Sequence, residues 1–120
     1  MINYNINEME NISVKATQAA KNAAGDFLVE KLGGEDNFPC GFAWVTVYPE
    51  NKGNTKLGKA ERALLESIGF KKDWTGKAWQ IWNPSNVNVQ NVDVKEAGAE
   101  AYADVMKAYG FKAYAGSRLD

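Results

Sequence analysis

Residues 42–48 (FAWVTVY) alternate between two kinds of side chain. Ala43, Val45 and Val47 are small and aliphatic, whereas the other members of the run are larger and partly polar: Phe42, Trp44, Thr46 and Tyr48. Successive side chains of a β-strand point to opposite faces, and aromatic and β-branched residues favour strands. The run therefore predicts a strand with one face for packing against helices and one aromatic face.

Three helices are indicated by apolar residues that recur at helical spacing. The first spans residues 8–32 and carries a stripe rich in alanine. The second has its stripe from Leu57 to Ile68. The third begins at Asp93, where Glu96 three residues later completes a pattern typical of a capping box.

The ends of the second and third helices share one local pattern. Gly-Phe-Lys follows the second helix at residues 69–71 and the third at residues 110–112. Glycine adopts the left-handed conformation that ends many helices, and the phenylalanine after it supplies a hydrophobic contact. We expect both helices to end in this way, and we expect Thr55 to cap the start of the second.

The remaining strands complete a mixed α and β pattern. Residues 70–73 and 77–82 flank the short turn 74–76 and predict a hairpin, and residues 111–115 form a last strand. After the first helix the order is strand, helix, strand, strand, helix, strand. This order predicts an α+β fold of the split βαβ (ferredoxin-like) type, with a four-stranded sheet and an extra N-terminal helix.

The 120 residues are expected to form one domain, residues 1–120. It divides into the N-terminal helix, 8–32, and an α+β core, 38–120. In the split βαβ arrangement, residues 42–48 and 77–82 are the two central strands and lie side by side. If Trp79 and Ile81 point toward the helices, Gln80 and Trp82 share the aromatic face of the first strand.

An aromatic sheet face of this kind needs a cover. The sequence leaves three candidates for this cover: the helix 8–32, a second subunit, or a ligand whose bases stack on the rings of Trp44 and Trp82. The two apolar surfaces of the chain, sheet face and alanine stripe, lead us to expect a homodimer. The Lys/Arg-Gly-aromatic signature of RNA-binding domains with this topology is absent from both central strands, which argues against RNA recognition of that type.

The absence of histidine excludes several kinds of catalytic and metal-binding site. With no histidine and one cysteine, Cys40, the chain lacks the residues for Ser-His-Asp and Cys-His catalysis and for the usual zinc and haem sites. We therefore expect no metal and no cofactor. Cys40 lies between Pro39 and Gly41, and it is interpreted as a small space-filling residue, with a nucleophilic thiolate as the alternative.

Charge and hydropathy indicate where the chain resides and what it does not bind. The net charge of −1 argues against a protein that coats duplex nucleic acid. No apolar run approaches the roughly 20 residues of a membrane helix, and the N-terminus lacks the features of a signal peptide. A single cysteine fits a reducing compartment. These features predict a cytoplasmic protein without a membrane segment.

Candidate ligand-binding residues lie in three places besides the aromatic face. The first is the C-terminal cluster Ser117, Arg118 and Asp120. Arg118 is one of two arginines against 12 lysines, and its planar guanidinium suits a phosphate or a carboxylate. The alternative for Arg118 is a structural ion pair with Asp120, Glu96 or the terminal carboxylate. The other places are the turn with Trp74 and Lys77 and the Asn-rich loop with Gln90. They are candidates for the rim of a cleft beside the sheet, and the alternative is that they simply connect strands and helices.

Four segments carry a resemblance to known sequences: FPCGFAWV, KAWQIWNPS, KEAGAEAYADV and KAYAGSRLD. In this order they resemble a group of small bacteriophage proteins, over roughly residues 38–120. The helix 8–32 lies outside the resemblance. The shared pattern falls on Pro39, Cys40, Gly41, Trp44, Gly76, Trp82, Gln90, Ser117, Arg118 and Asp120.

The resemblance implies a viral setting and supplies no chemistry of its own. Small phage accessory proteins often act by binding, so we expect a non-enzymatic counter-defence protein in the cytoplasm of the host cell. Its partner would be a small nucleotide-like ligand or a host protein. The alternatives are a structural or regulatory phage protein that acts through oligomerisation, and a small enzyme that uses Cys40.

Overall fold

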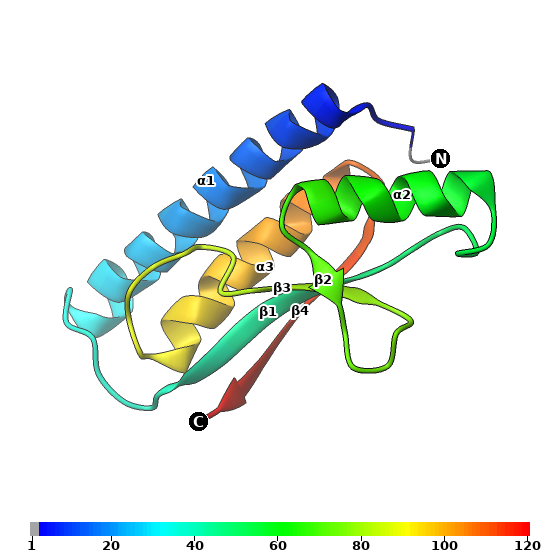
Figure 1. Cartoon of the computed structure of the whole chain (residues 1–120). Helices are drawn as coiled ribbons and strands as arrows, with labels where there is room; N and C mark the ends of the chain where they lie inside the picture. Colours follow the sequence, from blue (N-terminus) through cyan, green and yellow to red (C-terminus); the bar gives the residue numbers. More distant parts are fainter. Residues whose placement is uncertain (1–2) are drawn as a thin grey trace.

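The structure is a computed structural model that describes residues 3–120 as three α-helices and four β-strands (Figure 1). In chain order the elements are α1 (Ile6–Leu32), β1 (Gly41–Tyr48), α2 (Lys56–Ser67), β2 (Lys71–Lys72), β3 (Trp79–Trp82), α3 (Val92–Ala108) and β4 (Lys112–Leu119). The mixed α+β class is as predicted. The hairpin strands are shorter than predicted, and the last strand extends to Leu119 instead of ending at Ala115.

The helix ends follow the local signals closely. The Thr55 side chain accepts a hydrogen bond from the Gly58 N–H and caps α2, as predicted. After α2 the N–H of Phe70 donates to the C=O of Leu65, and Gly69 has φ of 99°. The same bond runs from Phe111 to the C=O of Met106 after α3. Both helices therefore end in the expected glycine motif.

The start of α3 differs from the prediction. Asn91, and not Asp93, is the N-cap, because the Asn91 side chain accepts from the N–H of Val94 at 3.1 Å. Asn91 is buried and held from outside the helix: its N–H donates to the Asp36 carboxylate, and its side-chain amide donates to the C=O of Asn37. Asp93 lies in the first turn, where a negative charge is favourable to the helix dipole.

The four strands form one sheet in the order β2-β3-β1-β4, and each neighbouring pair is antiparallel. The prediction that residues 42–48 and 77–82 contribute the two central strands is confirmed. Trp44 lies opposite Trp82 and Val45 opposite Ile81, so the two tryptophans share one face and the aliphatic residues share the other.

The hydrophobic core lies on one side of the sheet only. Val45 and Val47 have no exposed surface, and they belong to the same core cluster as Tyr102 and Met106 of α3. The helix α1 runs alongside α3, on the side of α3 away from the sheet, and its N-terminal end approaches α2 (Figure 1). Its contact with α3 is close because its buried residues are mostly small: Met9, Ile12, Ala16, Ala20 and Ala24.

One buried polar atom in this core has no hydrogen-bond partner among residues 3–120, the hydroxyl of Tyr102. Burial raises the pKa of Tyr102 to about 12, and the nearby Ser13 hydroxyl of α1 opposes this shift without reaching hydrogen-bond geometry. The hydroxyl therefore carries a desolvation cost that no bond offsets.

We predict that Tyr102→Phe raises the free energy of unfolding by about 1 kcal/mol, because it removes an unsatisfied buried hydroxyl and keeps the ring. Tyr4→Phe is the matched control. The Tyr4 hydroxyl donates to the C=O of Tyr109 at 2.6 Å, so its removal should lower the free energy of unfolding by about 1 kcal/mol. Urea denaturation measures both changes. A Tyr102→Phe protein less stable than the parent would contradict the prediction.

Candidate functional site

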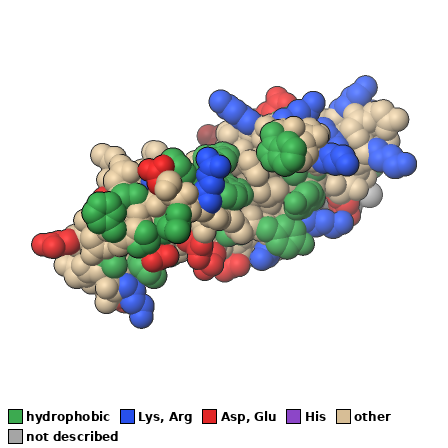
Figure 2. Space-filling view, turned by 90° about the horizontal axis from the view of Figure 1, so that it is seen from below, with side chains coloured by type: hydrophobic (Ala, Val, Ile, Leu, Met, Phe, Trp, Pro, Cys, Tyr) green, Lys and Arg blue, Asp and Glu red, His purple; other side chains and the backbone are tan. Residues whose placement is uncertain are grey.

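The sheet face opposite the helices is here called the open face. Strand register places eleven residues on it: Phe42, Trp44, Thr46, Tyr48, Lys71, Gln80, Trp82, Lys112, Tyr114, Gly116 and Arg118. Five of these are aromatic, three are cationic and none is acidic. Figure 2 views the molecule from below and shows hydrophobic side chains gathered along its length, with Lys and Arg and also Asp and Glu side chains among and beside them.

The open face is exposed to solvent. Trp82 retains 48% of its surface, Tyr48 48% and Tyr114 53%. The helix 8–32 was one of three candidates for covering this face, and that possibility is wrong, because α1 packs on α3 instead. The alanine stripe of α1 packs closely on the small residues Ala99 and Ala103 of α3. The same flat stripe is not complementary in shape to a row of large aromatic rings.

Trp44 and Trp82 lie together at the centre of this face. Their ring centroids are 4.8 Å apart and the rings are tilted by 32°. The indole of Trp44 also lies over Gly116 on the neighbouring strand, where an added Cβ would come within 2.7 Å of the ring. Glycine at position 116 is therefore required for Trp44 to lie flat against the sheet.

A short chain of hydrogen bonds runs beside the two tryptophans. The Trp82 Nε1–H donates to Oε1 of Gln80 at 3.3 Å, and Nε2 of Gln80 donates to Oγ1 of Thr46 at 3.1 Å. The Gln80 amide is thereby held in one orientation, with one N–H and one lone pair left for a ligand. Gln80 thus adds a fixed polar group to an otherwise aromatic surface.

Arg118 lies in β4, directly across from Phe42 on β1, and not on a tail beyond the last strand. Its guanidinium carbon is 5.5 Å from the ring centroid of Phe42 and 5.8 Å from that of Trp82. Within residues 3–120 no carboxylate oxygen lies within 4.0 Å of the guanidinium, so the structure gives no support to the alternative of a salt bridge to Asp120, Glu96 or the terminal carboxylate. Arg118 is exposed and directs its donors over the aromatic face.

The other two members of the C-terminal cluster have other partners. Ser117 faces the helices, opposite Ala43, and its hydroxyl donates to the Glu96 carboxylate. Asp120 follows β4, and its N–H donates to the C=O of Cys40. Of the three residues predicted to act together, Arg118 alone is a strand residue of the open face: Ser117 faces the helices because neighbouring strand residues face opposite ways, and Asp120 lies beyond the end of β4.

The two loops that were predicted to rim one cleft lie at different places. Trp74 and Lys77 belong to the turn before β3, at the end of the sheet where Val47 pairs with Trp79. This end is opposite to Arg118, and Trp74 is 94% exposed. In that turn the Thr75 hydroxyl holds the pKa of the Asp73 carboxyl below its usual value.

Gln90 lies near the Arg118 end of the sheet, where its C=O accepts from the Gly41 N–H. It lines a hollow of about 200 Å³ together with Cys40, Phe38, Asn37 and Asp36. Cys40 is half-buried there and forms an isolated bridge with Asn91. Gln90 is thus beside the open face and not part of it.

Lys95 is a residue that the sequence reasoning missed. It is buried in α3, its ammonium donates to the C=O of Gly41 at 2.9 Å, and it lies 5.6 Å from the ring centroid of Phe42. Phe42 therefore contacts two cations, Lys95 and Arg118. The available signal was a lysine on the buried side of a helix, where a charge is uncommon without a partner.

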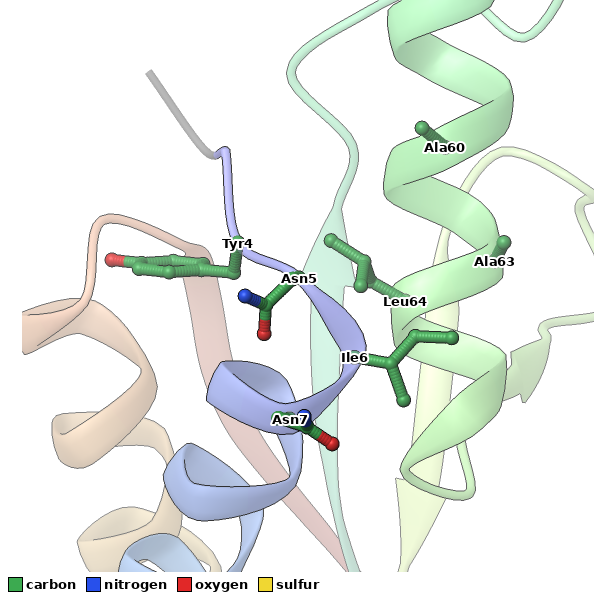
Figure 3. Close-up of a pocket in the computed structure, with 7 residues that line it drawn as sticks. All are labelled: Tyr4, Asn5, Ile6, Asn7, Ala60, Ala63 and Leu64. Atoms are coloured by element: carbon green, nitrogen blue, oxygen red, sulfur yellow. The ribbon is translucent and has the colours of Figure 1, made fainter.

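Another hollow lies away from these residues. It has a volume of about 610 Å³ and lies between the chain entering α1 and the helix α2 (Figure 3). Tyr4 points away from α2 in this view, whereas Ile6 points toward it. The lining includes Ala60, Ala63 and Leu64, its polar groups are those of Tyr4, Asn5 and Asn7, and none of its side chains is charged.

Comparisons of the chain with protein-family models, curated proteins and solved structures returned no match. Over residues 3–120, no helix has the length and apolar character needed to cross a membrane. In the same part of the chain, acidic and cysteine side chains do not gather in groups of three or more at metal-binding distance.

We predict that Arg118→Ala leaves the free energy of unfolding within about 1 kcal/mol of the parent, because an exposed cation–π contact contributes little. Glu61→Ala is the positive control, a substitution that we expect to lower the free energy of unfolding measurably. The buried Glu61 carboxylate accepts from the N–H groups of Glu50 and Asn51, so its loss should cost at least about 2 kcal/mol. Thermal and urea denaturation measure both. A loss of several kcal/mol in Arg118→Ala would make Arg118 a structural residue.

We also predict that Gly116→Ala displaces the Trp44 indole, because the new methyl group would overlap the ring. The exchange of excitation between Trp44 and Trp82 should weaken, and the near-ultraviolet circular dichroism of the tryptophans should change. Gly25→Ala, where a Cβ meets no atom within 4 Å, is the control and should leave the spectrum unaltered. Identical spectra for the two variants would contradict this account of Gly116.

Proposed function

We propose that this chain is a non-enzymatic binding protein whose open face takes a nucleotide-like ligand. The observation that carries the proposal is the composition of that face: five aromatic and three cationic side chains, with no carboxylate among them. A planar base stacks on aromatic rings, and a phosphate needs cations without competing acids.

The geometry supports a particular division of roles. The pair Trp44 and Trp82 offers a stacking surface of two rings, and Gln80 offers one donor and one acceptor at its border. Arg118 stands beside Trp82, with its fork-shaped guanidinium free of ion pairs within residues 3–120. A base over Trp82 would therefore bring its phosphate toward Arg118.

Several features favour binding over catalysis. The chain has no histidine, which removes the commonest general base. The groups whose pKa values are shifted, Asp73 and Tyr102, lie away from the open face. Cys40 faces the Gln90 hollow, and the cations of the open face, Lys71, Lys112 and Arg118, do not line that hollow.

We infer that the part of the chain from β1 to β4 is a split βαβ (ferredoxin-like) unit, to which α1 is added. The strand order β2-β3-β1-β4 with antiparallel neighbours supports this, as do α2 and α3 as the two connections. In a phage setting, we propose that such a protein acts in the host cytoplasm. It would withdraw a nucleotide signal of the host from its receptor.

The experiment is a titration of the protein with a panel of nucleotides and the matching nucleosides, followed by tryptophan fluorescence and calorimetry. Trp82→Ala should lower nucleotide affinity by about 1–3 kcal/mol, the value of one stacked base. Trp74→Ala removes an exposed tryptophan at the opposite end of the sheet and should leave affinity unchanged. Absence of binding across the panel, or equal losses in the two variants, would refute the proposal.

A further inference from the structure

The outer edge of β4 is an unpaired strand edge. β4 is the last strand of the sheet and pairs with β1 on one side. The Asp120 N–H donates to the C=O of Cys40, so the even-numbered residues of β4 direct their backbone groups toward β1. Backbone groups alternate sides along an antiparallel strand. The outward groups therefore belong to Ala113, Ala115, Ser117 and Leu119, and within residues 3–120 no backbone group bonds to them.

An unpaired edge of this length is a template for another strand. β4 has eight residues, whereas β2 at the other end of the sheet has two. From the helix layer, the ammonium of Lys107 in α3 lies 5.4 Å from the ring centroid of Tyr114. Lys107 therefore lies beside this edge near Tyr114.

We propose that this edge binds β4 of a second copy of the chain, antiparallel, about a two-fold axis at Gly116. Two geometric conditions restrict the register to those in which odd-numbered residues of β4 lie opposite odd-numbered residues of the partner's β4, and the Gly116 register is one of these. Residues directly opposite one another must point to the same face of the joined sheet. Residues whose backbone groups point outward must lie opposite residues whose backbone groups also point outward. With Gly116 opposite Gly116, Ala115 pairs with the partner's Ser117 and Ala113 with the partner's Leu119, and both conditions hold.

The same register pairs the charged side chains of the edge favourably. Lys112 lies opposite the partner's Asp120, and Tyr114 lies opposite the partner's Arg118, each pair occurring twice. These are an opposite-charge pair and a cation–π pair. The glycines at the axis have no side chains to separate the strands. A register shifted by two residues, with Ala115 at the axis, would place Lys112 against the partner's Arg118, two like charges.

One group of charges opposes the association. Glu100 and Asp104 of α3 line a hollow of about 330 Å³ beside Ala115, and the two-fold axis would bring both acids near their equivalents. We therefore expect a dimer that dissociates on dilution, and Glu100→Gln should tighten it. The dimer would join the two open faces into one surface, on which each Arg118 gains the partner's Tyr114 as a neighbour.

Sedimentation velocity over a dilution series tests the edge. Ala115→Pro removes an outward N–H and leaves the bonds to β1 in place, since proline is tolerated on the free side of an edge strand. We expect Ala115→Pro to weaken the dimer at least about tenfold, because it removes a bond at two equivalent positions. Ala115→Ser keeps the N–H and should remain a dimer. Circular dichroism confirms that both variants are folded.

A charge exchange tests the register. Lys112→Asp and Asp120→Lys should each weaken the dimer, and the double variant should restore it. Lys112 begins β4 and Asp120 follows its other end, so the two are far apart within one chain and the restoration arises only between chains. A protein that stays monomeric at every concentration would overturn the proposal. So would a dimer that survives Ala115→Pro, or single charge variants that the double variant does not rescue.

Discussion

The burial of Val45 and Val47 determines what every other strand presents to solvent. Both side chains are fully buried against the helix layer, and burying one valine stabilises the fold by about 1.5–3 kcal/mol. A shift of β1 by one residue would expose both valines and turn Trp44 toward α3. Because β3 and β4 pair directly with β1, their faces are fixed by the same two valines. The open face therefore owes its composition to packing on the other side of the sheet.

The features that were predictable from the sequence depend on neighbours a few residues away. Thr55 caps α2 through the N–H of Gly58, and the glycine ends of α2 and α3 are closed by bonds across five residues. The two faces of β1 follow from its alternation alone. Signals of this range can be read without knowledge of the rest of the chain.

The features that were missed depend on partners far away in the chain. Asn91 caps α3 because Asp36 and Asn37 hold it, and nothing in residues 91–96 distinguishes it from the pattern at Asp93 and Glu96. Arg118 belongs to a strand because β1 pairs with it at Phe42, although Gly116 and Ser117 have little strand propensity. The separation of Trp74 from Arg118 likewise follows from which end of β3 pairs with which end of β1. The residue types of the candidate site were therefore predictable from the sequence, whereas only some of the residues that lie together in it were.

Gly116 lets the Trp44 ring lie flat against the sheet, and this determines which substitutions the open face tolerates. Most residues of the open face touch solvent and one another, so their substitution alters recognition without entering the core. Gly116 is the exception, since any side chain there meets the Trp44 ring. A lineage of such proteins is thus free to vary its recognition surface ring by ring and cation by cation, while the smallest residue on that surface stays the least replaceable.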